Sequence, residues 1–335
     1  MNMRNWLEQI KTAPVRKPMP VLSFPCVQLM GISVKELISS SDNQAKGMKA
    51  VADRVDSLAS VSFMDLSLEA EAFGAEIKVT DTEVPTVIGT LIEDMEAAEK
   101  LKVPSLEDGR VGIYIEGMKK ALKLIDDRPV FAGVIGPFSL AGRLADVNKA
   151  FIYCKKKPEL LHMLLRKATD FLITYIKAYK ETGANGIVMA EPLAGMLSPR
   201  LAEKFSEPYV REIAEAVRAE NFIVIYHNCG NATIKMAESI YRTGCDAYHF
   251  GNAIDMKTML ETFPDDKVVM GNIDPAGQFT NGTTESIKIA TRELLEKCSV
   301  HPNFLISSGC DIPPAAKWEN IDAFFEAVKE FYDKK

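Results

Sequence analysis

The chain has 335 residues, of which 47% are hydrophobic and 26% charged, with 20 Gly and 17 Pro. This is the balance of an ordinary globular protein, and it excludes a disordered or fibrous chain. The net charge of −6 does not favour binding to nucleic acid or to an anionic membrane. The apolar stretches are too short to span a bilayer, and the N-terminus lacks the apolar core of a secretory signal. We therefore expect a cytoplasmic protein.

Eight short runs rich in Val, Ile, Phe and Ala alternate with helical patterns along the chain. Most of the runs are apolar without interruption, as is typical of parallel strands covered on both faces. They predict strands at 19–25, 60–66, 130–136, 184–190, 221–227, 245–251, 267–273 and 303–309. Between them we predict helices around 48–58 and over 158–182, 198–217, 231–243, 284–298 and 317–333.

This alternation predicts an α/β fold, a (β/α)8 TIM barrel, which usually takes about 250 residues. The surplus residues form an N-terminal helical extension and a small insertion after the second strand, where 77–87 alternates as a hairpin does. A doubly wound open sheet is the alternative fold, but the chain has no glycine-rich nucleotide turn. Since no linker or repeat divides the sequence, we expect 1–335 to be a single domain.

Chemically active side chains gather where the predicted strands end, and in a barrel of this kind those ends form the active-site mouth. His227 and Cys229 end the fifth strand, and residues two apart on a strand point the same way. Cys310 ends the eighth strand, which a closed barrel brings back across the mouth. One imidazole and two thiolates suit zinc, and three protein ligands leave a position open for substrate. A His-x-Cys pair is a weak pattern by itself, so this placement carries the prediction.

Three of the other four cysteines and one further histidine have plainer interpretations. Cys154, Cys245 and Cys298 lie on predicted helices or at a strand start, where a thiol packs as a small apolar side chain. His249, in the sixth strand, is either a hydrogen-bonded core residue or a residue that supports a metal ligand.

At these residues the sequence resembles the uroporphyrinogen decarboxylase superfamily over nearly its whole length. Within that superfamily it resembles the zinc-dependent methylcobamide:coenzyme M methyltransferases. The resemblance rests on 134-VIGPFSLAGRL-144, 183-GANGIVMAEPLAGMLSPRLAEKF-205, 226-YHNCG-230, 269-VMGNIDP-275 and 308-SGCDIPP-314. It implies a (β/α)8 barrel, Zn²⁺ bound by His227, Cys229 and Cys310, and transfer of a methyl group from a methylated corrinoid to a thiol such as coenzyme M. It also implies a partner, a small corrinoid carrier protein that docks at the barrel mouth.

The decarboxylase itself is the alternative within the family. Its arginine-rich motif, which pairs with the acidic groups of the porphyrinogen, would fall at 25-PCVQL-29, where this chain has no arginine. Cys310 also replaces a histidine of the decarboxylase's closing motif. Asp65, in 63-FMDL-66, does match the decarboxylase's catalytic aspartate. We expect Asp65 either to act in catalysis or to orient the substrate or a metal ligand.

The chemistry that the resemblance implies is thiol activation. Only the thiolate is a good nucleophile, and coordination to zinc removes the thiol proton. Glu191, at the end of the fourth strand, is either a fourth ligand that the substrate displaces or a carboxylate that steadies His227 or caps a helix. Arg143 and Arg200 are the arginines near the mouth that can bind an acidic acceptor. Homocysteine and a folate are the alternative acceptors, and a non-catalytic zinc protein would need a closed site of four ligands.

Overall fold

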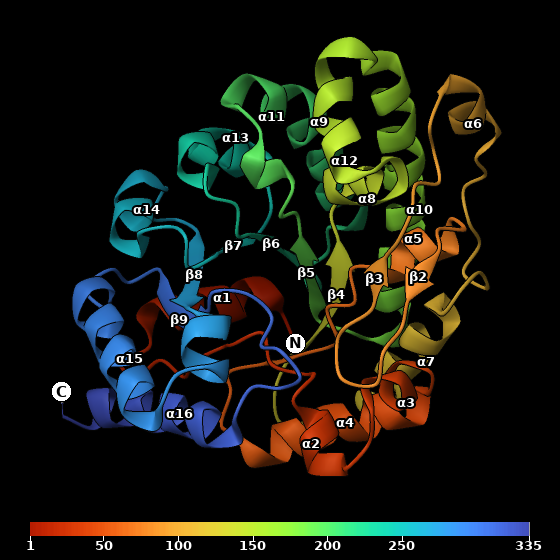
Figure 1. Ribbon diagram of the computed structural model, residues 1–335. Coiled ribbons are helices and arrows are strands. Elements are labelled where there is room, and N and C mark those ends of the chain that lie inside the picture. The colour runs from red at the N-terminus through yellow and green to blue at the C-terminus, as the bar shows by residue number, and fades with distance from the viewer. Residues whose placement is uncertain (335) are drawn as a thin grey trace.

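A curled parallel sheet forms the centre of the computed structural model, which describes residues 1–334 (Figure 1). Its strand order is β1-β4-β5-β6-β7-β8-β9, and each strand pairs in parallel with the next. The strands are β1 (Ser60–Val61), β4 (Val130–Ile135), β5 (Gly186–Ala190), β6 (Ile223–Asn228), β7 (Ala247–Phe250), β8 (Val268–Ile273) and β9 (Phe304–Ser308). Both faces are covered, which explains the uninterrupted apolar runs in the sequence. The predicted barrel fold is confirmed.

The segment 18–22 closes the barrel between the last and first strands, but the regular strand predicted at 19–25 is wrong. Met19 N donates to Ile306 O of β9 at 3.0 Å, and Leu58 N, just before β1, donates to Pro18 O at 2.9 Å. The segment therefore lies where the first strand was expected. Pro18 and Pro20 have no N–H, so they cannot complete a regular ladder of backbone hydrogen bonds. The second predicted strand is likewise shortened, from 60–66 to β1.

Apolar side chains fill the barrel interior, and helix α1 (Met3–Thr12) covers its N-terminal end. Four residues on one face of α1 are buried against the inward-facing side chains of the strands. The helix contributes Met3, Trp6, Leu7 and Ile10, and the strands contribute residues such as Val61, Phe131, Val188, Ile225, Met270 and Leu305. The predicted helical extension is thus confirmed, and it covers the end of the barrel opposite the strand C-termini.

Helices surround the sheet (Figure 1). The helix predicted at 158–182 is confirmed as α10 (Pro158–Thr182). It begins at a proline, which fits the first helical position, and it ends before Gly183, whose φ of 96° lies in the left-handed region. The helix predicted over 198–217 is broken into α11 (Pro199–Phe205) and α12 (Glu207–Val217), since Pro208 cannot continue the hydrogen-bond ladder. The others are α2 (Cys26–Met30), α3 (Val34–Ile38), α4 (Ser41–Arg54), α5 (Leu68–Ala72), α6 (Met95–Lys100), α7 (Val111–Ala121), α8 (Pro137–Ala145), α9 (Val147–Lys156), α13 (Ala237–Arg242), α14 (Met256–Thr262), α15 (Thr284–Cys298) and α16 (Trp318–Asp333).

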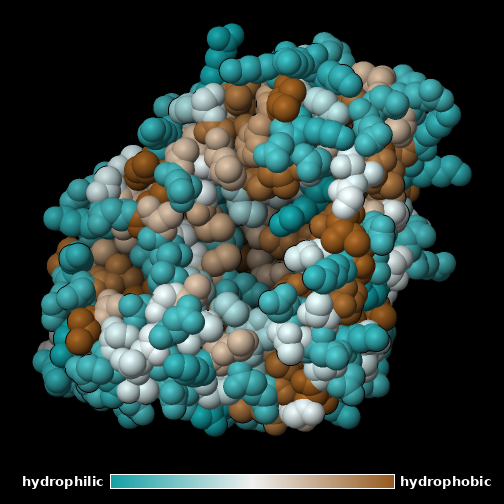
Figure 2. Space-filling model, in the orientation of Figure 1, coloured by the Kyte–Doolittle hydropathy of each residue, from teal (hydrophilic) through white to brown (hydrophobic). Residues whose placement is uncertain are grey.

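The predicted insertion after the second strand position contains a small hairpin. It is the antiparallel pair β2 (Ile77–Lys78) and β3 (Thr86–Val87), within the predicted range of 77–87. The face of the molecule shown in Figure 2 is hollowed near its centre, with polar and apolar residues around the hollow. Across residues 1–334, no helix is long and apolar enough to cross a membrane.

Candidate metal centre

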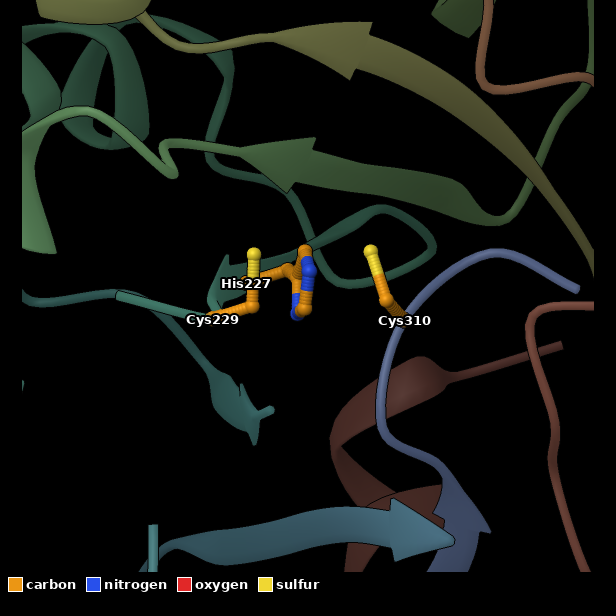
Figure 3. Close-up of side chains that lie close together, drawn as sticks. All are labelled: His227, Cys229 and Cys310. Carbon is orange, nitrogen blue, oxygen red and sulfur yellow. The ribbon is translucent and has the colours of Figure 1, made fainter. Parts of the chain in front are cut away.

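The three residues predicted as metal ligands lie together beyond the C-terminal ends of two strands. His227 is in β6, Cys229 directly follows β6, and Cys310 follows β9. Their ligand atoms, one nitrogen and two sulfurs, all lie within 4.8 Å of one another, as the close-up in Figure 3 illustrates. Tetrahedral zinc with bonds of about 2.0–2.3 Å places such atoms roughly 3.5–3.8 Å apart. Only a small adjustment therefore separates this cluster from a zinc-binding geometry.

Asn228 fixes the turn that carries Cys229, the second candidate ligand. Its side-chain amide donates to Glu191 O at 2.8 Å and to Tyr226 Oη at 3.0 Å. Its side-chain carbonyl accepts from Gly230 N at 2.9 Å and from a threonine hydroxyl at 2.8 Å. Two donors and two lone pairs are the whole hydrogen-bonding capacity of an asparagine side chain. The turn between His227 and Gly230 is therefore held by the protein without help from a metal.

Two glycines allow the close backbone approaches on which the cluster depends. A Cβ at Gly230 would lie 2.5–2.6 Å from backbone atoms of Gly195. A Cβ at Gly251, just after β7, would lie 2.4–2.6 Å from the Cβ and Cα of Cys229. Real Cβ atoms do not tolerate such distances, so a side chain at either position would push the Cys229 turn away from Cys310.

The two thiols interact with each other, and their ionisation differs. A hydrogen bond from Cys310 lowers the pKa of Cys229, although burial opposes this effect. The same hydrogen bond, together with burial, raises the pKa of Cys310 to about 12. In the absence of other charges, the pair thus ionises first at Cys229. A cation placed between the sulfurs would favour the thiolate form of both, because the thiolate is the ligand form of cysteine.

His227 has one satisfied ring nitrogen and one without a partner. Its Nδ1 lies 2.7 Å from Nδ1 of His249, on the neighbouring strand β7. Its Nε2 is buried and has no hydrogen-bond partner among the described residues. A buried polar atom without a partner is costly unless a ligand satisfies it. This orphaned nitrogen beside two thiols fits a borderline-soft cation such as zinc.

His249 is a buried, hydrogen-bonded histidine in contact with His227, so both sequence interpretations remain compatible with its contacts. Its Nε2 lies 2.8 Å from Ser307 Oγ of β9. Burial, and secondarily the neighbouring His227, lowers the pKa of His249 well below the ordinary value, so its ring is neutral near pH 7. The role of Ser307 was not expected from the sequence, where it is one serine of a short Ser-Ser pair.

Glu191 lies at the end of β5 and binds the N-terminus of α8. Its Oε2 accepts from Phe138 N at 3.1 Å, and its Oε1 accepts from Ser139 N at 2.6 Å. These amides are among those that a helix leaves unpaired at its first turn. Burial raises the pKa of Glu191 to about 7, despite these hydrogen bonds. The carboxylate is not a member of the group of three ligand residues in the described chain, and its contacts are those of a helix cap.

Asp65 is buried and its carboxylate is engaged on both oxygens. Oδ2 accepts from Arg110 Nη1 at 2.6 Å and from Tyr114 Oη at 2.9 Å, while Oδ1 accepts from the amide and the hydroxyl of Ser67. Arg110 also pairs with Glu71. The ion pair joins the loop after β1 to the start of α7. No local pattern in the sequence relates Arg110 to Asp65, and sequence analysis did not find this partner.

The remaining residues singled out in the sequence fall into two groups. Cys154, Cys245 and Cys298 are buried in the apolar core, and burial raises their pKa values, which agrees with their expected role as packing residues. Arg143, on α8, is half-buried, and burial lowers its pKa. No ion pair or hydrogen bond to its guanidinium is formed within the described residues. Arg200 is exposed at the start of α11.

Comparison with known proteins shows one family. A model described as uroporphyrinogen decarboxylase (URO-D) matches residues 8–331. The chain is 31% identical over 271 residues to the methylcobamide:CoM methyltransferase MtbA of Methanosarcina acetivorans, covering 80% of this chain and 78% of that protein. It is 28% identical over 286 residues to the uroporphyrinogen decarboxylase of Coxiella burnetii, covering 82% and 77%. A solved methyltransferase from Methanosarcina mazei superposes with a TM-score of 0.86 at 27% identity, covering 99% of this chain and 98% of that one.

Proposed function

Because the chain belongs to the uroporphyrinogen decarboxylase family, we propose that it is the kind of methyltransferase that transfers a methyl group from a methylated corrinoid to a thiol. In this proposal Zn²⁺ is bound by His227, Cys229 and Cys310. The observation that carries it is the cluster itself: an imidazole nitrogen and two thiol sulfurs lie within 4.8 Å of one another, and Nε2 of that imidazole is buried without a partner. Of the activities found among the relatives, thiol methylation is the one that uses such a set of soft ligands.

Zinc in this site would hold the sulfur of the acceptor as a thiolate, because it lowers the pKa of a coordinated thiol. The residues of the chain place that sulfur and limit its access to water. The barrel interior on the N-terminal side of the ligands is apolar, so solvent reaches the ligands from the C-terminal side. The thiolate supplies the electron pair of the new S–C bond, and the pair of the broken Co–C bond stays with the corrinoid.

This direction of approach implies the partner. Displacement at the methyl carbon needs the corrinoid in line with the attacking sulfur, on the open side of the barrel. A small corrinoid carrier protein that docks at the strand C-termini satisfies this requirement, and MtbA is named for a methylcobamide substrate. The same proposal places the protein in the cytoplasm, where thiols stay reduced.

Arg143 is the residue that we assign to the acceptor. A half-buried guanidinium without an internal partner is costly, and an acidic group of a bound substrate would compensate for it. Coenzyme M carries a sulfonate and homocysteine a carboxylate, so both thiols fit this chemistry. We assign Glu191 and Asp65 to shaping the site. Glu191 holds α8, the helix that carries Arg143, and Asp65 holds the loop after β1.

Decarboxylation of uroporphyrinogen fits these residues less well. The stretch 25-PCVQL-29 leads into and forms most of α2 and contains no arginine to pair with the acidic groups of a porphyrinogen. The carboxylate of Asp65 already accepts four hydrogen bonds, one of them from Arg110, so it has little capacity left for a substrate.

The test begins with metal analysis of the purified protein, which should hold about one zinc per chain. The Cys310→Ala variant should lose most of the zinc and the methyl transfer from methylcobalamin to coenzyme M or homocysteine. The Cys298→Ala variant, which removes a buried thiol on α15, should keep both. Full zinc content in Cys310→Ala, or conversion of uroporphyrinogen without transfer to any thiol, would show that the proposal is wrong.

A further inference from the structure

A series of hydrogen bonds runs from Nδ1 of His227, the ring nitrogen that has a partner, to the segment that closes the barrel. His227 Nδ1 and His249 Nδ1 are 2.7 Å apart, and His249 Nε2 and Ser307 Oγ are 2.8 Å apart. Ser307 Oγ then donates to Met19 O at 2.7 Å. His227, His249 and Ser307 lie on β6, β7 and β9, and all three are buried.

The donor and acceptor of each hydrogen bond follow from the last acceptor in the series, the carbonyl oxygen of Met19. A carbonyl oxygen can only accept, so the single proton of Ser307 points to Met19 O. Ser307 Oγ must then accept from His249, which places a proton on His249 Nε2. A neutral imidazole carries one proton, so His249 Nδ1 is left as an acceptor for His227 Nδ1–H. The remaining nitrogen of His227, Nε2, therefore carries a lone pair and no proton, which is the form that can bind a metal.

We propose that His249 and Ser307 are positioning residues that hold His227 in the tautomer able to bind metal through Nε2. This inference rests on the proposed function in one respect only, that the cluster binds zinc. The carbonyl of Met19 sets the direction, because no proton arrangement allows it to donate. The irregular segment 18–22 thus has a second role besides closing the barrel. Through Ser307 and His249, its backbone determines which ring nitrogen of His227 is free to bind metal.

Ser307 is the best residue for a test, because its side chain contacts His249 and Met19 O and none of the three proposed zinc ligands. Without the hydroxyl, His249 Nε2–H loses its side-chain acceptor, and the ring can carry its proton on Nδ1 instead. His249 Nδ1–H would then donate to His227 Nδ1, which forces the proton of His227 onto Nε2 and blocks the ligand atom. Losing the partner of a metal-bound histidine typically weakens metal binding about 10–100-fold, and Ser307→Ala would act through that partner, His249.

The matched control is its neighbour Ser308. Ser308 is equally buried on β9, and its Oγ accepts from Val21 N of the same closing segment at 3.0 Å, but no hydrogen bond joins its side chain to a histidine. Both Ser307→Ala and Ser308→Ala remove one hydrogen bond between β9 and segment 18–22, so they share any general effect on barrel stability. Ser307→Thr keeps the hydroxyl and should restore the affinity.

The experiment measures the dissociation constant of zinc by competition with a chromophoric chelator and the ring ¹⁵N spectrum of the zinc-free protein, which has only 4 His. We expect wild type and Ser307→Thr to show His227 protonated at Nδ1, and Ser307→Ala to bind zinc at least 10-fold more weakly than Ser308→Ala. Equal affinities in the two alanine variants, or His227 protonated at Nε2 in wild type, would overturn the inference. Failure of wild type to bind zinc would instead overturn the proposed function, while the spectrum still decides the tautomer.

Discussion

Replacing Glu191 by glutamine separates the two roles that the sequence allows for this residue. As a helix cap, the carboxylate accepts from Phe138 N and Ser139 N and does not contact the metal. A glutamine keeps one acceptor oxygen but turns an NH₂ group toward the other amide. Leaving one buried amide unsatisfied costs about 1–3 kcal/mol. We therefore expect Glu191→Gln to keep its full zinc content and to be less stable than wild type at pH 5.

The pH dependence of this difference follows from the raised pKa. The pKa of Glu191 is about 7 in the folded protein and 4.5 as the reference for an unfolded chain. Between these values the folded state keeps a proton that the unfolded state has lost, so the contribution of Glu191 to wild-type stability falls as pH rises, by about 1.4 kcal/mol per pH unit. From pH 5 to 7 this amounts to about 3 kcal/mol. Glutamine has no proton to lose, so the variant should match or exceed wild type at pH 8.

Urea denaturation at pH 5 and pH 8, with zinc analysis of each sample, measures both effects. The other ionisable groups are common to the two proteins and cancel in the difference between them. A stability difference that stays constant with pH would mean that burial does not raise the pKa of this carboxyl. Loss of zinc in Glu191→Gln would refute the cap assignment and make Glu191 a ligand, since a neutral amide is a much poorer zinc ligand than a carboxylate.

Two further expectations concern the preformed metal site. Gly230→Ala places a Cβ 2.5–2.6 Å from Gly195, so it should lower the free energy of unfolding in urea by about 1–3 kcal/mol and weaken zinc binding. The control is Gly112→Ala on α7, where no atom lies nearer than 3.6 Å. It should raise the free energy of unfolding by about 0.5–1 kcal/mol and leave zinc affinity unchanged. Removing zinc with a chelator should leave the circular dichroism spectrum unchanged, because hydrogen bonds of Asn228 hold the turn without metal. The midpoint of thermal unfolding should fall only by the amount that zinc binding adds to the stability of the folded state. Unfolding on chelation would contradict this account.

Much of the fold and the meeting of His227, Cys229 and Cys310 could be predicted from the sequence, because both depend on local patterns. Buried parallel strands give uninterrupted apolar runs, and the strand ends of a barrel converge whatever their separation in sequence. That rule placed His227 and Cys229 beside Cys310. The predicted strand at 19–25 failed because Pro18 and Pro20 remove backbone donors, an effect that apolar composition does not reveal.

The supporting contacts could not be predicted, because each joins side chains whose relation exists only in the folded chain. The carboxylate of Asp65 meets Arg110 from α7, and Glu191 meets the first turn of α8. Neither pair follows a sequence spacing that a helix or strand would create. Their position at strand ends singled out the aspartate and the glutamate in the sequence, but their contacts decide what each can do.

The arrangement of these contacts indicates where the protein tolerates change. The ligands sit on strand ends whose neighbours are held by close backbone packing at Gly230 and Gly251 and by the saturated side chain of Asn228. Such a frame fixes two sulfurs and one nitrogen before a metal arrives, so binding requires little ordering of the chain. Arg143 has no comparable support, since its guanidinium has no partner among the described residues. Under the proposed function, replacing Arg143 should therefore change acceptor binding and leave zinc binding unchanged.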